Sequence, residues 1–160
     1  MNRVENLETE VLNRLQLFKK NSNVFYAKKY PFFLRAKDLN QLIRLSEMQN
    51  IDKFRICIHK NNKEPIQEML LVLLKPQLIK PHKQEKSIIS YHVLDGAAAL
   101  KIYDDNGDVE FEENLSSSET GIQHIRLEAN RFRSIESLSD YFIYLEITTG
   151  PFQESDTIWL

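Results

Sequence analysis

The chain has 160 residues, of which 42% are hydrophobic, and a formal net charge of −2, so we expect one domain with a sizeable core and no general basic surface for nucleic acid. Its single cysteine, Cys57, excludes an internal disulfide and an all-cysteine zinc site. No apolar run approaches the roughly 18 residues that span a bilayer, and the N-terminus is charged where a secretory signal would be apolar, so we expect a cytoplasmic protein without a membrane partner.

The first 50 residues are predicted to form a helical and extended segment that packs on the rest of the domain. Apolar residues recur at helical spacing over residues 4–19, from Val4 to Phe18, which predicts a helix. A short strand is expected at 24–27, and an aromatic segment interrupted by Pro31 follows it. A second helix is expected at 39–49, with Asp38 as its N-terminal cap.

From Phe54 onward the hydrophobic period changes to two, which is typical of β-strands. Phe54 and Ile56 alternate with Arg55 and Cys57, and the continuous apolar run 69–74 predicts a strand buried on both faces. Further strands are expected at 88–94, 98–103, 109–111, 122–127, 132–135 and 141–148. Many short strands joined by turns such as Asn106-Gly107 predict a barrel or a two-sheet sandwich over residues 51–160, ending in a C-terminal tail.

The ordered set of motifs resembles the cupin superfamily, and within it the WbuC-type cupin-fold metalloproteins found with surface-polysaccharide genes. The segments that carry this resemblance are Arg55-Ile-Cys-Ile-His59, Pro81-His82, Ser90-Tyr-His-Val-Leu-Asp-Gly96, Tyr103-Asp-Asp-Asn-Gly107, and Glu146 followed by Gly150-Pro-Phe152. The resemblance implies a mainly β, cupin-type barrel (a double-stranded β-helix or jelly roll) with N-terminal helices. It covers roughly residues 38–158.

The resemblance also implies a metal site, and its ligand pattern is degenerate in this sequence. Of the four ligands that the resemblance implies, only His82 is present, because Gln84, Ile89 and Arg133 occupy the places of a histidine, a glutamate and a second histidine. We therefore predict no metal and no cofactor. A divalent transition metal held by His82 and Gln84, with Glu85 replacing the lost glutamate, is the alternative.

The same strands supply a set of candidate pocket residues. Arg133 is the most informative of them, because a buried guanidinium needs an anionic partner, either Glu146 or a ligand carboxylate or phosphate. The complete set of candidates is Arg55, His59, His82, Gln84, Tyr91, Arg133 and Glu146.

Three functions are compatible with this pattern. The first is a metal-free binding or accessory protein for a sugar or an anionic small molecule, in a carbohydrate or surface-polysaccharide context. The second is a sugar or nucleotide-sugar isomerase or epimerase that uses His82 and Tyr91 as acid and base, with or without a metal. The third is a purely structural homodimer. We expect binding rather than catalysis, and we expect a homodimer in each case, because the segments 24–27 and 30–34 can pair with a second copy.

Overall fold

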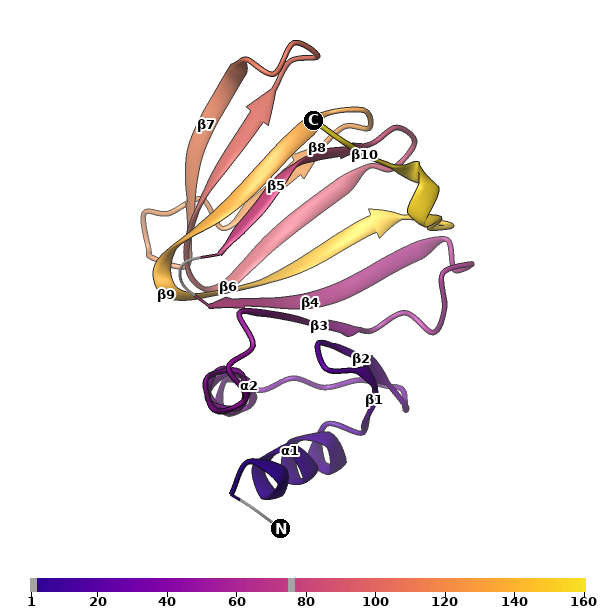
Figure 1. The fold of residues 1–160 in the computed structure, drawn as a ribbon, viewed down its shortest axis with the longest axis vertical. Coiled ribbons are helices and arrows are strands. Elements are labelled where there is room, and N and C mark those ends of the chain that lie inside the picture. Colours follow the sequence, from indigo (N-terminus) through magenta and orange to yellow (C-terminus); the bar gives the residue numbers. More distant parts are fainter. Residues whose placement is uncertain (1–2, 75–76) are drawn as a thin grey trace.

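The computed structural model describes residues 3–74 and 77–160 and confirms the prediction of a mainly β protein (Figure 1). The helices are α1 (Arg3–Arg14), α2 (Ala36–Gln49) and the short 3₁₀ helix η1 (Glu154–Asp156). The strands are β1 (Leu17–Asn21), β2 (Val24–Ala27), β3 (Lys53–Cys57), β4 (Ile66–Leu74), β5 (Leu78–Gln84), β6 (Ile89–Tyr103), β7 (Val109–Ser116), β8 (His124–Leu127), β9 (Phe132–Thr149) and β10 (Thr157–Trp159). None of the helices in the described residues is long and apolar enough to cross a membrane.

Two long strands, β6 and β9, pair along almost their whole length and organise the barrel (Figure 1). Residues 89–96 of β6 pair with 142–148 of β9, and residues 98–103 pair with 132–137. One register shift lies within the first block, between Val93 and Asp95, and the other separates the two blocks, between Gly96 and Ala98. The C-terminal half of β9 also pairs with β4, which continues to β3, β2 and β1, whereas its N-terminal half pairs with β5 and through it with β10. The two long strands thus belong to both halves of the barrel: one half contains β3 and β4 beside the C-terminal part of β9, and the other contains β5 and β10 beside its N-terminal part.

Gly96 makes the bend between these two blocks possible. Its φ of +85° lies in the region that favours glycine, and a Cβ atom there would lie 2.2 Å from the carbonyl oxygen of Tyr141 on the neighbouring strand. The backbones of β6 and β9 therefore approach too closely for any side chain at this position.

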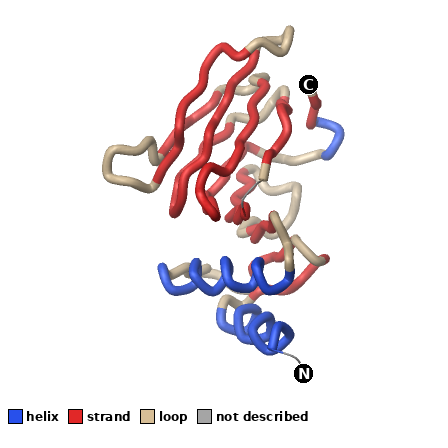
Figure 2. Tube along the Cα trace, turned by 60° about the vertical axis from the view of Figure 1, so that its left-hand side comes forward, coloured by secondary structure: helices blue, strands red, loops and turns tan. Residues whose placement is uncertain are grey.

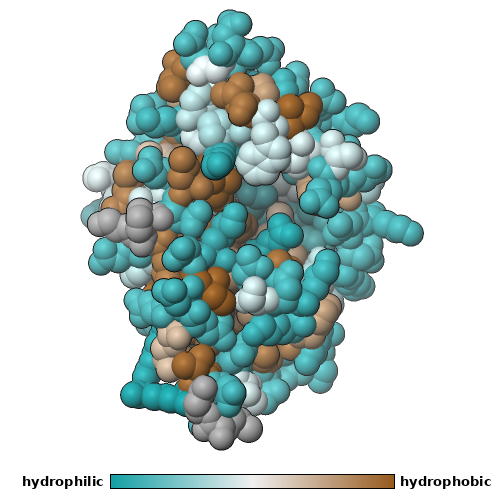
Figure 3. Space-filling view, viewed as in Figure 1, coloured by the Kyte–Doolittle hydropathy of each residue, from teal (hydrophilic) through white to brown (hydrophobic). Residues whose placement is uncertain are grey.

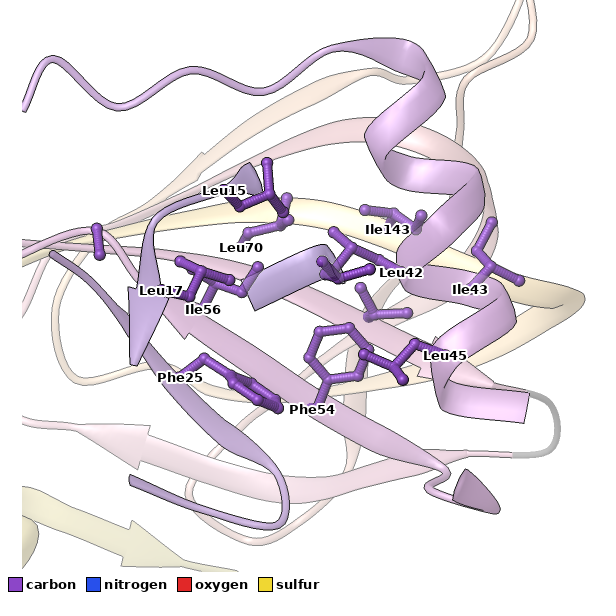
Figure 4. Close-up of a cluster of buried hydrophobic side chains, with 13 residues drawn as sticks. Leu15, Leu17, Phe25, Leu42, Ile43, Leu45, Phe54, Ile56, Leu70 and Ile143 are labelled. Atoms are coloured by element: carbon purple, nitrogen blue, oxygen red, sulfur yellow. The ribbon is translucent and has the colours of Figure 1, made fainter. Parts of the chain in front are cut away.

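Successive residues of the first barrel strands face opposite sides of the sheet, as predicted, and the apolar ones belong to two separate hydrophobic cores. Phe54, Leu70 and Val72 belong to a cluster that joins the strands to α1 and α2. Figure 4 shows Phe54 and Leu70 of this cluster beside Leu42 and Leu45 of α2. Leu71 and Leu73 belong to a second cluster inside the barrel. Both helices lie on one side of the strands (Figure 2). The apolar run 69–74 is therefore buried on both faces, as predicted, because it has a core on each side.

The prediction of one helix over residues 4–19 was wrong at its C-terminal end. The helix ends at Arg14, and Gln16 takes a left-handed conformation with φ of 53°. Leu17 then begins a strand that pairs with β2, and Phe18 stacks on Tyr26 with ring centroids 5.4 Å apart. Cross-strand pairing with the next segment thus replaces the last helical turn that the apolar spacing predicted.

The second helix begins three residues earlier than predicted, at Ala36, and Asp38 lies inside its first turn. The Asp38 carboxylate accepts a hydrogen bond of 2.7 Å from the backbone N–H of Arg35, so it caps the helix from within rather than preceding it. The C-terminal tail also differs from the expectation, because residues 157–159 form a strand on the edge of β5.

Candidate ligand-binding cavity

A cavity of about 470 Å³ is lined by residues from both halves of the barrel. Its lining follows the two-residue period of the strands: alternate residues of β3, β4 and β9 face it, while the residues between them face the helices or the outside. Those lining residues are Lys53, Arg55 and Cys57 on β3, Gln67, Met69 and Leu71 on β4, and Tyr144, Glu146 and Thr148 on β9. This volume lies within the usual range for small-molecule sites.

The structure places all seven predicted candidates around this one cavity: Arg55, His59, His82, Gln84, Tyr91, Arg133 and Glu146. Residues that the sequence prediction missed complete the lining. Lys53 and Tyr144 lie two positions from Arg55 and Glu146, so the strand period alone could have identified them. Phe152 and Trp159 reach the cavity because the tail folds back on β5, and no local pattern signals that.

Arg133 is the most deeply buried charged group of the cavity wall. Its side chain is 1% exposed; Nε donates a hydrogen bond of 2.8 Å to Tyr91 Oη, and Nη1 donates one of 3.3 Å to the carbonyl oxygen of His82. In the part of the chain that the structure describes, both hydrogen-bond acceptors of this guanidinium are neutral. Burial lowers the pKa of Arg133, but Tyr91 and the charge of Glu146 outweigh burial, so the pKa is raised. Glu146 thus interacts with Arg133 through its charge, and an anionic ligand would add a direct hydrogen-bonded partner.

The four positions where the resemblance implies metal ligands carry side chains that fit a transition metal poorly. Arg133 lies directly opposite His82 on the neighbouring strand, and the apolar Ile89 is 2% exposed. Gln84 offers an amide oxygen, which is a weaker donor than an imidazole nitrogen. Among the described residues, no group of three or more histidine, cysteine, aspartate or glutamate side chains is placed to hold a metal ion.

His82 is a neutral imidazole with one free acceptor. Its Nδ1 lies 2.8 Å from the Lys80 carbonyl oxygen, which can only accept, so Nδ1 carries the proton and Nε2 does not. Burial and, secondarily, the charge of Arg133 lower the pKa of His82 to about 4. Near neutral pH the ring is therefore uncharged and offers a lone pair at Nε2.

The cavity carries an excess of positive charge. Its basic side chains are Lys20, Lys53, Arg55 and Arg133, against the carboxylates of Glu146 and Glu154. Burial and then Arg55 lower the pKa of Lys53. Burial raises the pKa of Glu146, although Arg133, Arg55 and Lys53 oppose that shift. The arrangement favours a bound anion and disfavours a bound cation.

Two polar atoms in the lining are buried without a hydrogen-bond partner in the described residues: Gln84 Oε1 and Tyr144 Oη. Unpaired buried polar atoms are uncommon, and each costs about 1–3 kcal/mol. Water or a polar ligand in the cavity would provide the missing partners. Gln84 and Tyr144 come from strands of opposite halves of the barrel, so the unmet hydrogen-bonding capacity is distributed around the site.

Comparisons with known proteins support the fold and leave the activity open. Oxalate decarboxylase from Bacillus subtilis superposes with a TM-score of 0.54 at 17% identity, over 68% of this chain and 27% of that one. Pumpkin seed globulin superposes with a TM-score of 0.50 at 17% identity, over 60% of this chain and 23% of that one. The chain thus spans about a quarter of the length of each of these proteins. No curated protein sequence matches it.

Both structural neighbours are cupin-fold proteins, so the predicted cupin-type jelly-roll barrel is confirmed. Residues 34–115, just over half of the chain, match a family model described as "Domain of unknown function (DUF6016)". The chain therefore belongs to the DUF6016 family, and its fold is the cupin barrel.

Proposed function

We propose that this protein is a metal-free binding protein whose cupin cavity holds a small anionic ligand, with Arg133 as the anion receptor. The observation that carries the proposal is the burial of the Arg133 guanidinium in the cavity wall with only neutral hydrogen-bond acceptors. A ligand carboxylate or phosphate would provide the anionic partner, and a planar guanidinium suits both groups.

The surrounding charges support the same proposal. Lys53 and Arg55 belong to the same cavity lining and add to the positive potential that Arg133 creates. A divalent cation beside Arg133 would instead meet a like charge, with a repulsion of about 4 kcal/mol per unit charge at 4 Å and an effective dielectric constant near 20. His82 and the carboxylate of Glu146, which also lines the cavity, would have to compensate for that repulsion.

The carbohydrate context is a finer part of the proposal. It rests on the resemblance to the WbuC-type proteins and on the polar character of the lining, in which Gln84, Tyr144 and His82 offer hydrogen bonds suited to hydroxyl groups. We propose a sugar acid or a sugar phosphate as the ligand class.

The alternative, an isomerase or epimerase with His82 and Tyr91 as acid and base, has less support. Burial is the main cause of both shifts, lowering the pKa of His82 to about 4 and raising the pKa of Tyr91 to about 12. Efficient general acid–base groups have pKa values near the working pH. Turnover of a nucleotide sugar, lost in His82→Ala, would favour the enzyme over the binding protein.

Thermal unfolding with and without an anion tests the proposal. Untagged protein dialysed against EDTA is melted in glucose 6-phosphate, inorganic phosphate or uncharged glucose, as wild type, Arg133→Met and the control Arg131→Met. Arg131 is exposed, pairs with Glu110 and lies outside the cavity. A hundredfold excess over Kd should stabilise the wild type and the control by about 2.7 kcal/mol, or roughly 5–10 °C. Arg133→Met should not respond.

Two results would contradict the proposal. An equal response of all three proteins would show that Arg133 is not the receptor. Elemental analysis of untagged protein before any EDTA treatment that finds zinc, iron, nickel or manganese near one per chain, lost in His82→Ala, would show that a metal occupies the site after all.

A further inference from the structure

The C-terminal segment, residues 152–160, forms one side of the cavity. Strand β10 pairs with the edge strand β5 in the register Thr157↔Gln84, Ile158↔Lys83 and Trp159↔His82, and the Leu160 N–H donates a hydrogen bond of 3.1 Å to the Pro81 carbonyl oxygen. Phe152, Thr157 and Trp159 all belong to the cavity lining. This segment therefore contributes side chains to the site.

The pairing of β10 with β5, and of β5 with β9, places Trp159, His82 and Arg133 next to one another across three strands. Trp159 lies opposite His82, and His82 lies opposite Arg133, on three neighbouring strands. Residues directly opposite each other project from the same face of a sheet, and each of these three lines the cavity. Because neighbouring strands are about 4.8 Å apart, the Trp159 and Arg133 backbones are separated by about 10 Å. That span suits a ring that carries one anionic group.

The three side chains offer different and complementary chemistry. Trp159 is 60% exposed at the rim, and its ring centroid is 5.1 Å from that of His82 with an interplanar angle of 39°. Most of the largely apolar surface of this side chain is therefore open to a ligand at the mouth of the cavity. His82 Nε2 is free to accept a hydrogen bond, and Arg133 provides the buried positive charge.

We propose that Trp159 is a ligand-binding residue, and that the ligand is a hydroxylated ring bearing one anionic group, of monosaccharide size. The indole contacts the apolar face of the ring, His82 Nε2 accepts a hydrogen bond from a ring hydroxyl, and the anionic group lies at Arg133. This inference rests on the anion site proposed above and adds to it the ring and the residue that recognises it. A monosaccharide phosphate and a uronic acid share this chemistry.

Trp159 is the only tryptophan of the chain, so its fluorescence reports directly on the rim of the cavity. EDTA-dialysed wild-type protein is titrated with glucose 6-phosphate, glucuronate, AMP, inorganic phosphate and glucose. The melting temperature, followed by circular dichroism, reports occupancy of the cavity by each compound. Glucose 6-phosphate or glucuronate should shift the Trp159 emission and reduce its quenching by acrylamide. Inorganic phosphate should raise the melting temperature and leave the emission unchanged.

The matched variants are Trp159→Ala, Trp159→Phe and the control Phe111→Ala, whose side chain is 40% exposed and lies outside the cavity. Trp159→Ala should weaken binding of glucose 6-phosphate by about tenfold, the loss expected for one aromatic contact. Its affinity for inorganic phosphate should not change. Trp159→Phe should retain most of the affinity, and Phe111→Ala all of it.

The outcomes separate this inference from the proposal on which it rests. If no anion raises the melting temperature of the wild type, both are wrong. If glucose 6-phosphate raises it without altering the Trp159 emission, and Trp159→Ala binds as the wild type does, only the role of Trp159 is wrong. If AMP alone alters the emission, the indole binds a nucleobase and the sugar-ring assignment is wrong.

Discussion

Replacing Arg133 by methionine should remove anion binding and leave the ligand-free protein about as stable as the wild type. The side chain is 1% exposed and donates two hydrogen bonds, to Tyr91 and to the His82 carbonyl. Losing two hydrogen bonds from a charged group costs about 3–6 kcal/mol. Removing a guanidinium from water costs several kcal/mol, which methionine does not incur, although the charge of Glu146 opposes that cost in the wild type. The two contributions nearly cancel, so we expect a net change below about 2 kcal/mol.

A double variant separates these contributions. In Arg133→Met the Tyr91 hydroxyl, on a side chain that is 1% exposed, loses its hydrogen-bond donor at a cost of about 1–3 kcal/mol. Tyr91→Phe/Arg133→Met removes that hydroxyl together with the guanidinium. The double variant should therefore be more stable than Arg133→Met by about 1–3 kcal/mol.

Urea denaturation measures the free energies of unfolding, with Arg131→Met as the exposed control that should change by less than about 0.5 kcal/mol. A loss of more than about 3 kcal/mol in both the single and the double variant would refute the reasoning. The guanidinium would then be a structural element that the protein fully satisfies, and no unmet charge would remain for a ligand.

Three further predictions concern pH, the barrel bend and assembly. The pKa of His82 is about 4 in the folded protein, against a usual value of 6.5, so the unfolded chain binds more protons between pH 4 and pH 6.5. The contribution of His82 to the free energy of unfolding therefore falls by up to about 3 kcal/mol as the pH falls from 6.5 to 4. His82→Gln should lose less stability than the wild type between pH 7 and pH 4.5, and an equal loss would show that the imidazole titrates normally. Gly96→Ala should lower the free energy of unfolding by more than about 3 kcal/mol, because the new Cβ would lie 2.2 Å from a backbone oxygen. Gly107→Ala should lower it by about 1 kcal/mol, because this position also has a positive φ but its nearest neighbour is a leucine side chain at 3.4 Å. Similar losses for the two variants in urea denaturation would contradict the role of Gly96 in the bend. The expectation that residues 24–27 pair with a second copy was wrong, because β2 already pairs with β1 on one edge and with β3 on the other. The homodimer therefore stays a prediction that rests on the segment 30–34: sedimentation velocity at micromolar concentration should show a dimer, and a monomer mass alone would count against it.

The barrel could be predicted from the sequence because apolar and polar residues alternate clearly along its strands. Phe54 and Ile56 face the helices while Arg55 faces the cavity, as the two-residue period indicates. Strand β1 could not be predicted, because Leu17 and Phe18 continue the helical apolar spacing while their partners in β2 determine the actual structure. The spacing of apolar residues alone does not indicate whether this segment continues the helix or pairs with β2.

The candidate site was also only partly predictable from the sequence. His82, Gln84 and Arg133 were identified by their places in the family pattern, and the structure brings them to one cavity. Trp159 was not identified, since its role depends on pairing with His82, which lies 77 positions earlier in the chain (159 − 82). Such a long-range register leaves no periodic trace in either segment.

A crystal structure of the untagged protein, purified without EDTA and soaked with glucose 6-phosphate, tests the central claim most directly. We predict phosphate density within about 3 Å of the Arg133 guanidinium, with the sugar ring against Trp159 and a hydroxyl group at His82 Nε2. Density for a metal ion bound by His82 and Gln84, or a sugar phosphate bound anywhere other than beside Arg133, would contradict it.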